Sequence, residues 1–116
     1  MAYFEELVSW QKAKELTLKV YSLMQNVKDY GFRDQIQRAS VSIMNNIAEG
    51  SDYNSNQMFV KFLKIAKGSC AEVRRMTYLC KELNCCTEVQ FNELLNESRI
   101  LSSTINNHIK YLLSTI

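Results

Sequence analysis

Residues 32–49 read FRDQIQRASVSIMNNIAE, and this stretch decides the fold. At 100° per residue its apolar and small side chains gather within an arc of about 80°, as expected for a helix that packs one face on a core. The members of this arc are Phe32, Ile36, Ala39, Ser40, Ile43 and Ile47. The stretch therefore predicts an amphipathic helix bounded by Gly31 and Gly50, since glycine can take the left-handed conformation that ends helices.

The same spacing continues on both sides of this helix, over residues 4–27, from residue 54 or 55 to about 84, and from 87 to 116. The predicted core side of the first helix holds Trp10, Ala13, Leu16, Thr17, Val20, Leu23, Met24 and Val27. That of the third holds Phe59, Phe62, Ala66, Ser69, Val73, Met76, Cys80 and Leu83. That of the fourth holds Phe91, Leu94, Leu95, Ser98, Leu101, Ile105, His108, Ile109, Leu112, Leu113 and Ile116.

Helix-end signals separate these segments. Ser55 or Asn54 can cap the third helix, and Thr87 with Gln90 has the form of a capping box at the start of the fourth. The chain has no proline and three glycines, which favours long uninterrupted helices over a turn-rich β fold. Four helices with short links predict one all-α domain over residues 1–116, an antiparallel up-down-up-down four-helix bundle.

Composition limits the function classes. The chain has 116 residues, of which 47% are hydrophobic and 22% charged, so it can bury enough apolar surface to fold. It has no apolar run of about 18 residues, and its N-terminal segment is acidic at Glu5 and Glu6. We therefore expect no membrane span and no secretion signal, and a cytoplasmic location.

Cysteine and histidine placement argues against a metal site and against catalysis. Cys70, Cys80, Cys85 and Cys86 contain no Cys-x-x-Cys pair, and His108 is the only histidine. We expect reduced thiols, with Cys70 and Cys80 in the core and Cys85 and Cys86 in a connection. His108 lies on an apolar stripe, and the chain has neither a phosphate loop nor a Glu-x-x-His pair. The sequence predicts a protein that is not an enzyme and that has no cofactor.

A polar line runs along one flank of residues 32–49, beside the apolar arc. Its members are Gln35, Arg38, Ser42, Asn46 and Glu49. Two readings are open: an ordinary solvated edge, or a half-buried seam whose groups need partners. In the second, Arg38 could meet Glu72 of the third helix, Ser42 and Asn46 could bond across a helix pair, and the seam could face a second subunit.

Gly68 lies about 120° from the core stripe of the third helix, where glycine costs roughly 1 kcal/mol relative to alanine. The glycine is either a neutral accident on a solvated face or the point where a helix of another subunit crosses, because small residues let helix axes approach closely.

Positive charge on the third helix forms two lines, with Lys67, Arg74 and Lys81 in one and Lys61, Lys64 and Arg75 in the other. A charged solvated face is the common explanation. In an oligomer, however, symmetry would repeat this face, so that the net charge of +2 per chain would become +10 for five copies. Contacts to a nucleic-acid backbone would then be salt-sensitive and not sequence-selective.

Several blocks resemble one protein family. They are YGFRDQIQRASVSI at residues 30–43 and NIAEG at 46–50, WQKA at 10–13, and FLKIAKGS at 62–69 with Glu72. These blocks resemble the signature of the four-helix bundle proteins encoded by intervening sequences of bacterial large-subunit ribosomal RNA genes. This group also includes the accessory variability proteins of diversity-generating retroelements. The likeness covers the chain nearly end to end, although Met44 stands where the family usually has proline.

The resemblance implies a homopentameric barrel of four-helix bundles around a central channel. It makes Arg38, Asn46, Glu49 and Glu72 structural or interfacial residues. Retroelement members bind a reverse transcriptase and structured RNA through a basic surface, which points to a non-enzymatic adaptor for RNA or a nucleoprotein. The alternative is a protein-interaction module without nucleic-acid affinity, and an enzyme that uses His108 is a third, weaker reading.

Overall fold

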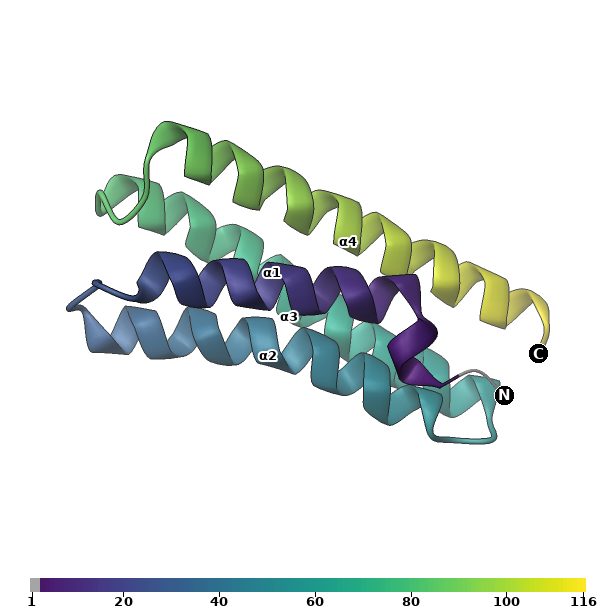
Figure 1. Ribbon diagram of the computed structural model, residues 1–116. Helices are drawn as coiled ribbons and strands as arrows, with labels where there is room; N and C mark the ends of the chain where they lie inside the picture. The colour runs from purple at the N-terminus through teal and green to yellow at the C-terminus, as the bar shows by residue number, and fades with distance from the viewer. Residues whose placement is uncertain (1–2) are drawn as a thin grey trace.

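The computed structural model describes residues 3–116, which form a rod of four α-helices with extents of 45 × 20 × 20 Å (Figure 1). A short 3-10 helix, η1 (Phe4–Glu6), precedes α1 (Val8–Met24), α2 (Tyr30–Ser51), α3 (Asn56–Glu82) and α4 (Glu88–Ser114). Consecutive helices run antiparallel, and the described chain contains no strand. Helix α1 packs against α2 and α4, and α3 packs against the same two helices. The predicted all-α up-down-up-down bundle is confirmed.

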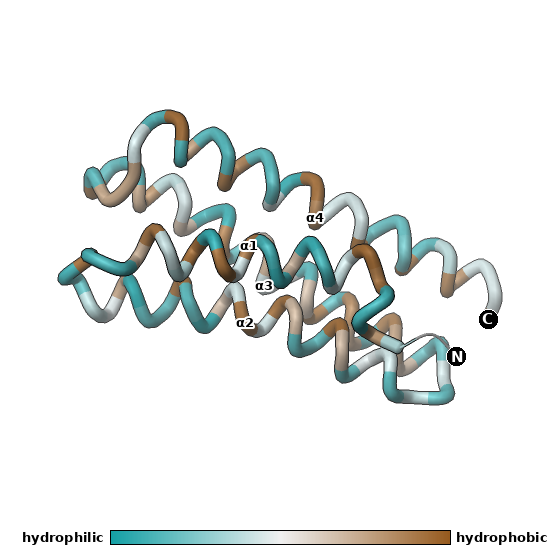
Figure 2. The backbone as a smooth tube through the Cα atoms, viewed as in Figure 1, coloured by the Kyte–Doolittle hydropathy of each residue, from teal (hydrophilic) through white to brown (hydrophobic). Residues whose placement is uncertain are grey.

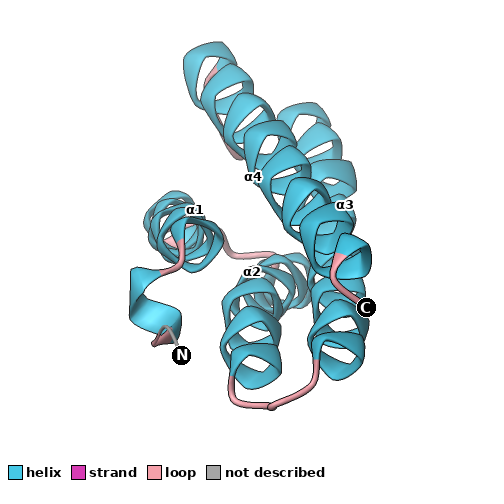
Figure 3. Ribbon diagram, turned by 90° about the vertical axis from the view of Figure 1, so that its right-hand side faces the viewer, coloured by secondary structure: helices cyan, strands magenta, loops and turns pink. Residues whose placement is uncertain are grey.

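The core forms from one face of every helix. Figure 2 shows hydrophobic and hydrophilic residues alternating along each helix, as an amphipathic bundle requires. All six residues of the predicted α2 arc are buried. Viewed along the rod, the helices surround this core, with α4 lying oblique to α1 (Figures 1 and 3).

The core face of α3 differs in part from the prediction. The buried residues are Val60, Leu63, Ala66, Cys70, Val73, Met76, Thr77 and Cys80. Phe59 and Phe62 are only half-buried, because their rings lie at the edges of the face: Phe62 stacks on Tyr53 with centroids 5.4 Å apart, and Phe59 meets His108 at 4.8 Å. Ser69 is also half-buried, and the predicted core residue Leu83 is exposed at the end of the helix.

Leu113 and Ile116 of the predicted α4 stripe are exposed as well. Leu113 follows the buried Leu112 by one residue, about 100° around the helix, so its side chain lies on the outer side of α4, and Ile116 lies past the end of the helix.

The first helix is shorter than predicted, because Leu7 has an extended backbone that separates η1 from α1. Helix α1 ends at Met24, so Val27 lies in the connection. Gly31 does not end the first helix, which corrects the prediction: it lies within α2, and no glycine of residues 3–116 has a positive φ. Asp29 caps α2 instead, because its side chain accepts a hydrogen bond from the backbone N–H of Phe32 at 3.2 Å.

Gly50 also differs from its predicted role as a helix terminator. Helix α2 continues to Ser51, runs unbroken through Met44, and buries Gly50 against α3. A Cβ at position 50 would lie 2.8 Å from Cβ of Phe62 and 2.9 Å from Cδ1 of Phe59. Glycine is therefore needed here for the close approach of two helices and not for a turn.

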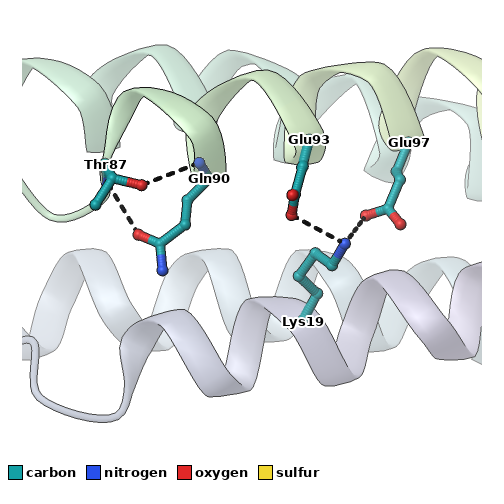
Figure 4. Close-up of polar contacts among 5 residues, drawn as sticks. All are labelled: Lys19, Thr87, Gln90, Glu93 and Glu97. Carbon is teal, nitrogen blue, oxygen red and sulfur yellow. Dashed lines mark hydrogen bonds and ion pairs between the residues drawn. The ribbon is translucent and has the colours of Figure 1, made fainter.

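The starts of α3 and α4 match the sequence signals. Ser55 caps α3 by accepting a hydrogen bond from the N–H of Met58 at 3.2 Å. At α4 the Thr87 hydroxyl accepts from the N–H of Gln90 at 3.1 Å, and the N–H of Thr87 donates to Oε1 of Gln90 at 2.9 Å (Figure 4). The capping box is confirmed.

An ion-pair bridge joins α1 to α4. Nζ of Lys19 lies 3.0 Å from Glu97 and 3.5 Å from Glu93 (Figure 4). The hydrogen bond to Glu97 is the main cause that raises the pKa of Lys19. Because Lys19 and both carboxylates are partly exposed, the bridge adds little to stability.

Candidate subunit interface and basic surface

The middle of the polar flank of α2 faces α3. The hydroxyls of Ser42 and Ser69 lie 2.9 Å apart and share a hydrogen bond between the two helices. Asn46 donates from Nδ2 to the backbone oxygen of Ser42 at 2.8 Å and to its hydroxyl at 3.0 Å. All three side chains are half-buried and hydrogen-bonded. This part of the flank is therefore a half-buried polar seam, which was one of the two alternatives left open by the sequence, and not a solvated edge.

The ends of the flank are more exposed, and the acid of α3 has a different partner from the one considered in the sequence. Nε2 of Gln35 donates to Oε2 of Glu72 at 3.1 Å, whereas Arg38 makes no ion pair within residues 3–116. Arg38 comes three residues after Gln35, so its side chain is turned about 60° further toward solvent on the helix. This position explains why Gln35, and not Arg38, bonds to Glu72. Glu49 is also exposed.

A shallow hollow of about 400 Å³ lies on the outer side of this flank. It is lined by Tyr21, Arg38, Val41, Ser42, Asn45 and Asn46. The sequence reasoning did not include Tyr21, Val41 or Asn45 in the candidate interface. Tyr21 belongs to α1 and is half-exposed, so its ring extends the α2 flank with an aromatic surface contributed by a neighbouring helix. Helical spacing within one segment cannot reveal such a contribution.

Gly68 lies on the open surface of α3. It is exposed, and an added Cβ would meet nothing within 4 Å. Ile65, Glu72 and Leu79 follow one another at intervals of seven on this side of the helix, and the bond from Gln35 places Glu72 at the edge nearest α2. Ile65 and Leu79 are 45% and 48% exposed. The outer α2–α3 surface thus contains exposed aliphatic side chains and a glycine that no close contact within this chain explains.

The six candidate basic residues divide between two sides of α3. On the α4 side, Nζ of Lys67 donates to Oδ1 of Asn106 at 3.0 Å, and Nζ of Lys81 lies 3.4 Å from Glu88. Lys81 also lies 4.5 Å from the ring centroid of Phe91. Arg74 lies seven residues from each of these lysines, so the three form one line on the side of α3 that faces α4, with the charge at Lys81 partly compensated.

The second line, formed by Lys61, Lys64 and Arg75, lies near Gly68 on the outer face of α3. All three side chains are exposed, and none forms an ion pair within the described chain. This line borders the candidate subunit interface, whereas the line through Lys67 and Arg74 lies on the other side of the helix. The structure therefore distributes the basic residues as two stripes and not as one patch.

His108 is half-buried near the C-terminal end of α4, where its ring meets Phe59 edge-on. Within residues 3–116 its ring nitrogens make no hydrogen bond. Burial lowers the pKa of His108 below its usual 6.5. The ring lies at the edge of a hollow of about 530 Å³ that is also lined by Tyr53, Phe59 and Tyr111. This arrangement is that of a packing histidine.

Acidification should destabilise the bundle through His108. Its folded-state pKa lies below its unfolded-state pKa, so between the two values the unfolded chain binds a proton that the folded chain does not. Stability should therefore fall as the pH drops below about 6.5. The urea midpoint, measured at about pH 7.5 and 5.5, should fall more for the natural chain than for His108→Gln. Equal falls in both chains would contradict this assignment.

The cysteines lie where the sequence predicts. Cys70 and Cys80 are buried, and Cys85 and Cys86 are half-buried in the connection between α3 and α4. Burial raises the pKa of Cys70 to about 11, and its Sγ donates to the backbone oxygen of Ser98 at 3.2 Å. The described residues hold no group of His, Cys, Asp and Glu side chains arranged to hold a metal ion. None of the helices in this part of the chain has the length and apolar character needed to cross a bilayer.

The fold and the surface together define a class, an antiparallel four-helix bundle with a polar seam between α2 and α3 and basic stripes on α3. The model of the 23S rRNA-intervening sequence protein family matches residues 5–107, and the chain belongs to this family. The family resemblance of the sequence blocks is confirmed.

One solved structure supports the fold. It is a protein of unknown function from the S23 ribosomal protein family of Bacteroides thetaiotaomicron, with a TM-score of 0.82 and 24% sequence identity. The match covers 89% of the present chain and 99% of that one. The search of curated proteins returned no match.

Proposed function

We propose that this chain is a non-enzymatic protein that assembles with copies of itself, as a pentamer, and serves as an adaptor for structured RNA or a nucleoprotein. The observation that carries the assembly is Gly68. Glycine on a helix surface costs roughly 1 kcal/mol relative to alanine, and nothing within this chain compensates for that cost. A helix of a second subunit that crosses at Gly68 would compensate for this cost, because glycine allows the two helices to approach closely.

The surroundings of Gly68 suit such a contact. Ile65 and Leu79 supply apolar area on the same face, and the α2 flank offers polar groups at its edge. Arg38 and Glu49 are exposed and carry opposite charges, so they can pair with a neighbouring subunit and fix its register. Lys61, Lys64 and Arg75 then lie at the rim of this interface.

The RNA role depends on the assembly. A net charge of +2 is weak for one chain, but five copies carry +10 and repeat each basic stripe around the symmetry axis. The stripe through Lys67 and Arg74 lies on the α4 side of α3, so it stays accessible when the face around Gly68 is covered. Contacts of these side chains with phosphates would position the RNA without reading its sequence.

Light scattering coupled to gel filtration tests the assembly. The natural chain should have the mass of five subunits, and Gly68→Trp should reduce it to a monomer because a bulky ring blocks the helix crossing. Ser103→Trp, on the exposed side of α4, is the matched control and should remain pentameric. Helix content from circular dichroism should be the same in all three proteins. A natural chain that is monomeric at micromolar concentration, whatever the salt, refutes the assembly.

RNA affinity at two salt concentrations tests the adaptor role. Binding should be strongest near about 50 mM salt, because neutralising phosphates releases counterions. Lys67→Gln with Arg74→Gln should weaken binding and flatten its salt dependence. The control pair Lys28→Gln with Lys110→Gln removes the same charge from exposed positions outside α3 and should have a smaller effect. Absence of binding at low salt removes the RNA role, and a protein partner captured despite nuclease treatment would then favour the protein-interaction module.

A further inference from the structure

The end of α3 folds back on itself. Asn84 has a left-handed backbone with a φ of 57°. The N–H of Cys85 donates to the backbone oxygen of Cys80 at 2.9 Å, and the N–H of Asn84 donates to that of Lys81 at 3.1 Å. These two bonds define a Schellman motif, which places the residue after the left-handed one against the last full turn of the helix. The motif therefore holds Cys85 beside Cys80.

Three thiols gather at this point. Cys80 is completely buried in the core, and the half-buried Cys85 and Cys86 pack against the same core. Burial raises the pKa of Cys80, and the neighbouring thiols of Cys86 and then Cys85 raise it further. Cys85 also lines a cleft of about 680 Å³ between the α1–α2 connection and the α3–α4 connection. Two partly accessible thiols thus lie next to one buried thiol, and a cleft reaches the group from solvent.

We propose that Cys80, Cys85 and Cys86 form a reversible oxidation site in which a hydroperoxide closes a disulfide between Cys80 and one member of the adjacent pair. The thiol of Cys85 or Cys86 gives up its proton, and the thiolate attacks one oxygen of hydrogen peroxide. The O–O bond breaks, a sulfenic acid forms, and the hydroxide that leaves takes up a proton and becomes water. The thiol of Cys80 then attacks the sulfenic sulfur, and a second water leaves as the S–S bond forms. Two thiols lose two hydrogens, and hydrogen peroxide is reduced to two waters.

Cys80 is the expected partner because a disulfide between adjacent residues is strained, whereas the Schellman motif already brings Cys80 and Cys85 together. The new bond would tie the last turn of α3 to the connection that leads into α4. A thiol reductant would restore the open form, since thiolate attack on the disulfide reverses the step.

Trypsin separates the cysteines into different peptides, which makes the test direct. Cys80 falls in residues 76–81, Cys85 and Cys86 fall together in residues 82–99, and Cys70 falls in residues 68–74. The full chain is treated with hydrogen peroxide, free thiols are blocked by alkylation, and the digest is analysed by mass spectrometry. We expect the peptides 76–81 and 82–99 to be linked, with a mass two hydrogens below their sum plus one alkyl group on the remaining cysteine of 82–99, and to separate after treatment with a thiol reductant.

Variants assign the link. Cys80→Ser and the double variant Cys85→Ser with Cys86→Ser should each abolish the linked peptide, whereas Cys70→Ser should retain it. The double variant keeps the test valid if the buried Cys80→Ser chain fails to fold. Three results overturn the proposal: no linked peptide after peroxide treatment, a disulfide confined to residues 82–99, or a linked peptide found only in covalent dimers on a non-reducing gel.

Discussion

Gly50→Val should lower the free energy of unfolding by about 3 kcal/mol, the upper part of the usual range for overpacking a core. The first side-chain atom at this position would lie 2.8 Å from Cβ of Phe62, and that atom is attached directly to the backbone of α3. A change of rotamer cannot move it away. The helices α2 and α3 would have to separate, and the Ser42–Ser69 bond on the adjacent flank would weaken with them.

Gly68→Val is the matched control, because the same side chain enters open space on α3. In the isolated bundle it should change stability by less than about 0.5 kcal/mol, since valine is a slightly better helix former than glycine. Urea unfolding followed at several protein concentrations separates this effect from any coupling to assembly. Equal losses for the two valine variants would show that the contact at Gly50 does not limit the approach of α2 to α3.

The contrast between these two glycines shows what sequence reasoning can predict. Gly50 follows Ile47 by three residues and Ile43 by seven, so it belongs to the apolar arc of α2 by the same spacing that predicted the core. The general tendency of glycine to end helices outweighed that signal in the sequence interpretation. Gly68 was correctly separated from the core, because its angle on α3 is far from the apolar stripe.

All six residues of the predicted α2 arc are buried, because this helix packs between α1 and α3, but the arc did not include Gly50 and Ser51, which are buried as well. Helix α3 packs between α2 and α4, and its large rings at Phe59 and Phe62 cover the edges of the core without entering it. Which of two adjacent apolar residues points inward then depends on the neighbouring helices. The spacing along α3 alone does not contain that information.

The polar seam was predictable in position and only partly in its pairs. The spacing placed Ser42 and Asn46 together, and the structure joins Ser42 to Ser69 of α3, whereas Asn46 bonds to Ser42 within α2 and not across the helix pair. The choice between Gln35 and Arg38 as the partner of Glu72 depends on side-chain reach across two helices, which helical spacing does not define. Tyr21 entered the same surface from α1. Surfaces built from several helices are thus the part of the site that sequence patterns describe least.

Leu63→Ala should be the most damaging single truncation on α3, with a loss of about 2–5 kcal/mol of unfolding free energy. Leu63 is completely buried at the centre of the core, so its removal leaves a cavity that four packed helices cannot easily collapse. Leu113→Ala removes the same atoms from a side chain that is 50% exposed at the end of α4. Its cost should stay within about 0.5 kcal/mol.

Urea denaturation of both leucine variants at matched protein concentration decides the comparison, with unchanged slopes required for the two losses to be compared. The apolar spacing of the sequence assigns both leucines to helices, but Leu113 lies on the outer side of the last turn of α4, next to the buried Leu112. A large loss for Leu113→Ala would therefore mean that another chain covers this end of the rod. That result would place a subunit contact at this end of the rod, and the exposed face around Gly68 would no longer account for the assembly by itself.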